Sequence, residues 1–276
     1  MIFSIKRVPK IWKDSAMFAS TIFACIATVM GVAGVSLDSI ISKQKWWVRL
    51  LVILAVYALF VVIVRVILSF TVTKGITIKI RGISVSIKQG NIFDAKGWKV
   101  IPFNEYFDTT VDDVIISSTT LNGIFINEHV SNLKKLQDVI ISASKDPSTF
   151  RKYKKGNRFA YPLGRIITYE DYMLLAFSHF NKQNVAHISK PEYEHCLLIM
   201  WKEIRRTYAN KPVFLPLIGS GITSFDDIPE KSNFDLLKCM ICTLRASGEN
   251  INQPITILLT KDVMQEINIY EMKGVI

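Results

Sequence analysis

The stretch that decides the fold is Pro212-Val-Phe-Leu-Pro-Leu-Ile-Gly-Ser-Gly-Ile-Thr-Ser-Phe-Asp-Asp227. An apolar run typical of a buried strand leads directly into two glycines, and a helix is expected shortly afterwards. Glycine permits a positive φ and a close approach of ligand to backbone, and successive free amides at a strand end bind anions. The spacing therefore predicts a phosphate-binding turn at Gly219, Ser220, Gly221, Ile222 and Thr223, although a tight turn without a ligand would show the same pattern.

Strand and helix patterns alternate on either side of this turn. Residues 76–80 and 83–87 alternate with period two around Arg81-Gly82, which predicts a β-hairpin. Further buried strands are predicted at 99–103, 113–116 and 255–259, with one or two strands in 166–177. Helices are predicted at 132–144, 191–209, 233–244 and from residue 262. Such alternation indicates an α/β fold with helices on both faces of a mostly parallel or mixed sheet.

Two apolar segments precede this domain, at residues 15–37 and 50–72. Each is long enough to cross the hydrocarbon of a bilayer as a helix, and Arg65 is the one charge within them. A signal peptide is the alternative for the first segment, but its apolar run is too long for one. A buried core helix is the alternative for the second, and Trp46 and Trp47 at its start favour a membrane interface instead.

Basic residues predict the orientation of these two spans. They are more numerous on the two outer flanks than on the connecting loop, so both termini are expected in the cytoplasm. The predicted organisation is a membrane anchor over residues 1–73 and a cytosolic domain over residues 74–276. The predicted location is the bacterial inner membrane, with lipid as one partner.

The composition bears on cofactors and partners. The formal net charge is +11, which suits anionic partners in general, and no nucleic-acid partner is expected. Cys239-Met-Ile-Cys242 has no second pair, and the histidines show no metal-binding spacing, so no metal site is expected.

Three motifs give the domain its resemblance to a known family. They are Gln89-Gly-Asn-Ile-Phe93, Val100-Ile-Pro-Phe-Asn104 and Leu215-Pro-Leu-Ile-Gly-Ser-Gly-Ile222, and Leu121-Asn-Gly-Ile-Phe125 is a candidate for the family's other glycine-containing phosphate loop. Over residues 83–265 the chain resembles the macro domains, which bind ADP-ribose and related nucleotides. The resemblance implies a three-layer αβα sandwich with a central mixed sheet, no cofactor, and an ADP-ribose derivative as ligand.

The resemblance also implies roles for single residues. The turn Gly219–Ile222 would cradle the diphosphate through its amides, and Gly123 and Ile124 would close over it from the other side. Asn91 and Ile92 would recognise adenine, and Asn104 would face the distal ribose. No catalytic residue is assigned.

Two N-terminal spans joined to a diverged macro domain resemble the membrane-anchored macro effectors of type II Thoeris anti-phage defence systems. That resemblance implies a partner TIR-domain enzyme that makes a nucleotide signal on infection, reported as histidine–ADP-ribose. The effector would bind the signal, form homo-oligomers and disrupt the membrane, which leads to abortive infection.

Departures from the family pattern leave a second hypothesis open. Asn91 stands where macro domains usually place Asp, and Ile101 replaces the first Asn of the strand-end motif. These losses favour binding without turnover. The alternative is a membrane-bound ADP-ribosyl hydrolase, for which Asp108, Asp112 and Asp113 are acid/base candidates by proximity, or else members of a solvated loop.

Overall fold

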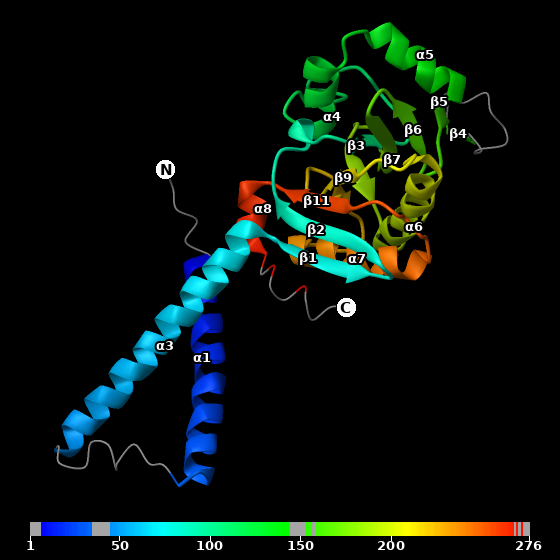
Figure 1. The fold of residues 1–276 in the computed structure, drawn as a ribbon. Helices are drawn as coiled ribbons and strands as arrows, with labels where there is room; N and C mark the ends of the chain where they lie inside the picture. The colour runs from blue at the N-terminus through cyan, green and yellow to red at the C-terminus, as the bar shows by residue number, and fades with distance from the viewer. Residues whose placement is uncertain are drawn as a thin grey trace. The chain divides into compact units, whose positions relative to one another are not determined.

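The computed structural model describes residues 7–34, 45–143, 153–155, 158–267, 269 and 272. Its contacts divide the chain into two compact units, Met1–Lys74 and Gly75–Ile276 (Figure 1). The first unit is a helix pair and the second contains all the strands.

The first unit consists of α1 (Arg7–Val32) and α3 (Trp46–Lys74). Within them, Trp12–Val32 and Trp46–Phe70 are long and apolar enough to cross a membrane, by length and composition. Both overlap the predicted spans. The first helix begins earlier than predicted, and residues 35–37 of its predicted span lie outside the described residues.

Side-chain contacts join the two helices. The hydroxyls of Ser20 and Tyr57 lie 2.8 Å apart, and the Phe23 ring packs edge-on against Tyr57 at 5.9 Å. The Arg65 guanidinium lies 4.2 Å from the centre of the Trp12 ring. Because hydrogen bonds and aromatic packing are the forces that hold helices together in an apolar medium, these contacts define a helical hairpin.

A nine-stranded mixed sheet forms the centre of the second unit, in the order β1-β2-β11-β9-β3-β7-β8-β10, with β6 also paired to β7. The strands are β1 (Ile76–Ile80), β2 (Ile83–Gln89), β3 (Trp98–Asn104), β6 (Ile166–Tyr169), β7 (Tyr172–Phe180), β8 (Ala186–Ile188), β9 (Val213–Pro216), β10 (Ser224–Phe225) and β11 (Ile255–Leu259). A separate hairpin pairs β4 (Tyr153–Lys155) with β5 (Arg158–Ala160).

The five central strands β2, β11, β9, β3 and β7 are parallel. Strand β1 is antiparallel to β2, both β6 and β8 are antiparallel to β7, and β10 is parallel to β8. Every residue of β11 is buried, as expected for a strand covered on both faces. The helices that provide this cover are α4 (Leu121–Ile124), α5 (Leu133–Ala143), α6 (Lys190–Thr207), α7 (Asn233–Ser247) and α8 (Lys261–Glu266), with one 3-10 turn, η1 (Ile92–Asp94), and one π-helical turn, η2 (Phe125–His129). The predicted three-layer α/β fold is confirmed.

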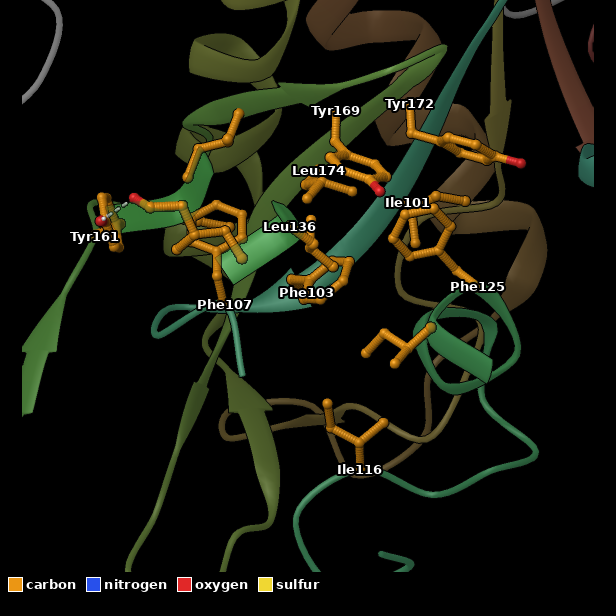
Figure 2. Close-up of a cluster of buried hydrophobic side chains, with 14 of the residues drawn as sticks. Ile101, Phe103, Phe107, Ile116, Phe125, Leu136, Tyr161, Tyr169, Tyr172 and Leu174 are labelled. Carbon is orange, nitrogen blue, oxygen red and sulfur yellow. Dashed lines mark hydrogen bonds between the residues drawn. The ribbon is translucent and has the colours of Figure 1, made fainter. Parts of the chain in front are cut away.

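Figure 2 shows the apolar layer between the sheet and the pair α4 and α5. Ile101 and Phe103 of β3 point into it together with Leu174 of β7. Phe125 meets Phe103 edge-on at 6.1 Å, and Leu136 of α5 is fully buried against them. This layer fixes the position of β3, whose last residue reaches the candidate site.

Helices α6 and α7 pack on each other and on the other face of the sheet. Both are largely apolar where they are buried, and Trp201 of α6 donates from Nε1 to the hydroxyl of Thr243 on α7 at 3.1 Å. Cys196 contacts the carbonyl of Ala176 on β7. The two helices hold β7 and β9 from the side opposite α4 and α5.

One predicted strand is wrong. Residues 113–116 form a turn in which the Asp112 carboxylate accepts the amides of Val114 and Ile115, at 3.0 and 2.7 Å. Asp113 has a φ of +58°. Only Ile116 of this apolar run is buried, and it forms an isolated parallel β-bridge with Val111 instead of a strand. Residues 166–177, for which one or two strands were expected, form the hairpin of β6 and β7.

Candidate functional site

The connections that follow the neighbouring parallel strands β3 and β9 cross opposite faces of the sheet. After β3 the chain passes through α4 and α5 to β7, and after β9 it passes through α7, on the other face, to β11. Among the described residues, register pairs join the two strands only at Trp98–Val213 and Lys99–Phe214, near their amino ends. Ligands of open α/β sheets bind at the carboxyl ends of the strands at such a reversal. The candidate site therefore lies where β3 and β9 end.

The glycine turn follows β9 at this point. Gly219 has a φ of +87°, and Ser220 donates both its amide and its hydroxyl to the Leu217 carbonyl, at 3.2 and 2.8 Å. Tyr193 of α6 anchors the start of the turn, since its buried hydroxyl donates to the Ile218 carbonyl at 2.9 Å. The turn is therefore a closed and firmly supported structure.

The amides of this turn remain available. Within the described chain, the amides of Gly219, Gly221 and Ile222 have no hydrogen-bond acceptor. A Cβ placed on Gly221 would meet no atom within 4 Å, and the side chain of Ile222 is 73% exposed. Thr223 is buried. Free amides beside open space are the arrangement that binds a phosphate.

Lys231 holds the turn from its other side, and sequence analysis missed this residue. Its ammonium donates to the carbonyls of Gly219 at 2.9 Å and of Thr223 at 2.8 Å, and also to the carbonyl of Gly221. Burial lowers the pKa of Lys231. The only available clue was a lysine shortly after the glycines, which many surface loops also contain.

The structure places Asn91 and Ile92 at the carboxyl end of β2. Asn91 is exposed and begins η1, and its side-chain oxygen accepts the amide of Phe93 at 3.2 Å. Ile92 is buried in the apolar layer of Figure 2 with Leu258. The Ile92 side chain therefore contributes to the core, and only the Asn91 side chain is exposed to a ligand.

Asn104 is the last residue of β3, and its side chain holds the local backbone. The carboxamide oxygen accepts the amides of Tyr106 and Asp108, at 3.0 and 3.3 Å, and its nitrogen donates to the Asp108 carboxylate at 2.9 Å. Asn104 is 3% exposed. The Asn104 carboxamide therefore holds the turn that follows β3, and the ribose contact implied for Asn104 stays a prediction.

Gly123 and Ile124 lie in a short helical turn, and the diphosphate contact that the resemblance implies for them stays a prediction. Thr120 caps α4, and it accepts the amide of Gly123 on its hydroxyl at 3.3 Å and the amide of Ile124 on its carbonyl at 2.9 Å. A Cβ on Gly123 would lie 2.2 Å from the Ser117 carbonyl. Glycine is therefore required here for close packing.

A buried acid–base pair stands beside Asn104, and it too was missed. Glu105 is fully buried, and its carboxylate lies 2.9 Å from Nδ1 of His179. Nε2 of the same ring lies 3.2 Å from the carboxylate of Glu192. Because both ring nitrogens face carboxylates, ionised carboxylates require both nitrogens to carry protons. These residues are far apart in the sequence, so no local pattern predicts the cluster.

Asp112 and Asp113, two of the acid/base candidates of the hydrolase hypothesis, accept hydrogen bonds from backbone amides. Hydrogen bonds from the amides of Ile115 and Val114 lower the pKa of Asp112, and those from Ser118 lower the pKa of Asp113. A general acid working near neutral pH needs a shift in the opposite direction. Asp108 accepts the hydrogen bond from Asn104. Within the described residues no group of three or more His, Cys, Asp or Glu side chains could hold a metal.

Comparisons with solved structures find macrodomains of Oceanobacillus iheyensis. A mutant of that macrodomain aligns with 73% of this chain and 97% of its own, at 11% identity and a TM-score of 0.49. The same macrodomain with ADP aligns with 72% of this chain and 95% of its own, at 12% identity and a TM-score of 0.47.

Comparisons of the amino-acid sequence identify the family. The family model "Thoeris protein ThsA, Macro domain" matches residues 85–260. The Thoeris protein ThsA of Bacillus amyloliquefaciens (strain Y2) is 37% identical over 236 residues, which cover 82% of this chain and 79% of that protein. This chain therefore belongs to the ThsA family of Thoeris proteins and carries the macro domain of that family.

Proposed function

We propose that this protein is a membrane-anchored receptor of Thoeris defence whose macro domain binds an ADP-ribose-type nucleotide. The observation that carries the proposal is the glycine turn at the carboxyl end of β9, with the amides of Gly221 and Ile222 free beside open space. A diphosphate is the part of such a nucleotide that this turn would bind. The membership in the ThsA family supports the same ligand class.

The helical hairpin of α1 and α3 would anchor this receptor in the inner membrane. Its length and composition suit a double span, and the basic flanks favour cytoplasmic termini. The macro domain would then face the cytosol, where nucleotide signals are made. The residues 1–73 and 74–276 are the anchor and receptor parts of this proposal.

The steps before and after ligand binding are proposed from the resemblance to the effectors of type II Thoeris systems. A partner TIR-domain enzyme would release the signal on infection, as histidine–ADP-ribose. Binding would favour a homo-oligomer of the effector, and several hairpins together would disrupt the membrane and cause abortive infection. Energetically, the ligand shifts this assembly only to the extent that it binds the assembled form more tightly.

Binding without turnover fits the surroundings of the turn better than hydrolysis. Asp112 and Asp113 cap backbone amides, and Asn104 is engaged with Asp108. We therefore expect the full chain to retain ADP-ribose conjugates unchanged, as measured by chromatography of the nucleotide after incubation. Release of free ADP-ribose in proportion to enzyme concentration would favour the hydrolase instead.

Calorimetric titration of the full chain in lipid nanodiscs tests the site, with ADP-ribose and histidine–ADP-ribose as ligands. The wild type and Gly221→Ala are expected to bind alike, because a Cβ at this position meets open space. Gly221→Glu is expected to abolish binding, because its carboxylate would stand beside the free amides and repel the diphosphate. Equal affinity of Gly221→Glu and Gly221→Ala would refute the site.

A further inference from the structure

All three N–H donors of the Lys231 ammonium form hydrogen bonds with the glycine turn. A lysine ammonium has three donors, and here they reach the carbonyls of Gly219, Gly221 and Thr223. These carbonyls belong to alternate residues of one short segment. A single side chain therefore fixes the direction of three alternate peptide groups.

The direction of those carbonyls sets the direction of the amides. In a planar trans peptide the N–H points opposite to the C=O of the same unit. With the Gly221 carbonyl directed to Lys231, the amide of Ile222 points to the opposite side, where it has no acceptor among the described residues. The lysine thus lies behind the turn and the free amide faces outward.

The charge of Lys231 has no partner in the described part of the protein. No carboxylate lies within ion-pair distance of its nitrogen there, and the side chain is half-buried. Burial lowers the pKa of Lys231 because it disfavours the charged form. A cation in this situation gains stability when an anion binds nearby.

We propose that Lys231 is a positioning residue for a phosphate-bearing ligand: it holds carbonyls of the turn on one side, directs the free amide of Ile222 to the other, and supplies the positive charge. The inference rests on the proposed function for the identity of the ligand. It adds a residue that does not touch the phosphate but decides whether the turn can bind it.

Two variants and a matched control test this inference on the full chain in nanodiscs. Lys231→Met removes the three hydrogen bonds and the charge, and ADP-ribose affinity should fall by about tenfold or more. Lys231→Arg restores the charge but not three donors on one atom, so it should recover part of the loss. Lys238→Met removes an exposed lysine of α7 and should leave the affinity unchanged.

Hydrogen–deuterium exchange without ligand provides a separate readout. The peptide covering residues 217–224 should exchange faster in Lys231→Met than in the wild type and Lys238→Met, while peptides of β7 and β11 stay protected. If Lys231→Met fails to fold, Lys231→Arg carries the test, with an intermediate increase expected.

Wild-type affinity and wild-type exchange in Lys231→Met would overturn the inference, and so would an equal loss of affinity in Lys238→Met. Failure of the wild type itself to bind ADP-ribose would refute the proposed function instead. The exchange measurement would still decide whether Lys231 orders the turn.

Discussion

Gly219 and Gly221 lie two residues apart but are constrained differently. Gly219 has a φ of +87°, and its missing Cβ would lie 3.4 Å from the Tyr193 ring, which is ordinary contact. Gly221 has ordinary backbone angles and open space around it. Gly219 is therefore needed for the shape of the turn, whereas the backbone at Gly221 can accept a Cβ.

This difference predicts the effects of two alanine substitutions on stability. Gly219→Ala should lower the free energy of unfolding by about 1–2 kcal/mol, because a left-handed backbone is strained for a residue with a Cβ. Gly221→Ala should change it by less than about 0.5 kcal/mol. Thermal unfolding of the detergent-solubilised chain measures both, and equal effects would contradict the assigned conformations.

The contact between the Glu105 carboxyl group and the His179 ring allows a second prediction at single residues. His179→Ala should lower the free energy of unfolding by about 3 kcal/mol, because it removes a hydrogen-bond partner of a fully buried carboxyl group. His187→Ala is the control, since the His187–Asp226 pair is partly exposed and should contribute less than about 1 kcal/mol. Urea unfolding compares the two, and a larger effect at His187 would contradict the prediction.

Among the elements, α6 has the best-defined beginning. Ser189 accepts the amide of Glu192 on its hydroxyl, and Glu192 accepts the amide of Ser189 in return. The same Glu192 carboxylate reaches His179. The helix start is thus joined to the buried acid–base pair at the end of β3.

This capping box gives a prediction with a defined pH dependence. Ser189→Ala should cost about 1 kcal/mol at neutral pH. The hydrogen bond from the Ser189 hydroxyl is the main cause that lowers the pKa of Glu192 below its usual 4.5. A lowered folded-state pKa stabilises above the unfolded value and loses this contribution as pH falls. The difference between variant and wild type should therefore shrink below about pH 4.5, as unfolding at several pH values would show.

Elements with a clear period were predictable from the sequence, and those shaped by distant neighbours were not. The hairpin of β1 and β2 follows from alternation, and α6 follows from its proline and apolar spacing. Residues 113–116 have the apolar composition of a strand but no strand beside them. Gly123 looks like a loop glycine, yet the nearby Ser117 carbonyl explains why glycine occupies that position.

At the scale of the whole molecule, site residues that are contiguous in the sequence could be predicted from it, whereas those that meet only in the folded chain could not. The glycine turn is contiguous, so its residues were identified directly. Lys231 and the pair Glu105–His179 act through contacts that only the folded chain creates. The family resemblance supplied the fold, and the roles that it implies for Asn104, Gly123 and Ile124 stay predictions.

The two-part organisation predicts how the chain behaves in membranes. The full chain should remain in the membrane pellet after alkaline carbonate extraction, because two spans bury far more apolar surface than a peripheral contact. A C-terminal tag should be digested by added protease in inverted vesicles and protected in right-side-out spheroplasts. The opposite protection pattern would contradict cytoplasmic termini, and release by carbonate would contradict the spans.

The most direct measurement of the central claim is an experimental structure of the full chain with ADP-ribose bound. We predict diphosphate oxygens within hydrogen-bond distance of the amides of Gly221 and Ile222, with Lys231 still bound to the carbonyls behind them. A nucleotide bound away from this turn, or a turn whose amides point away from the diphosphate, would contradict the account.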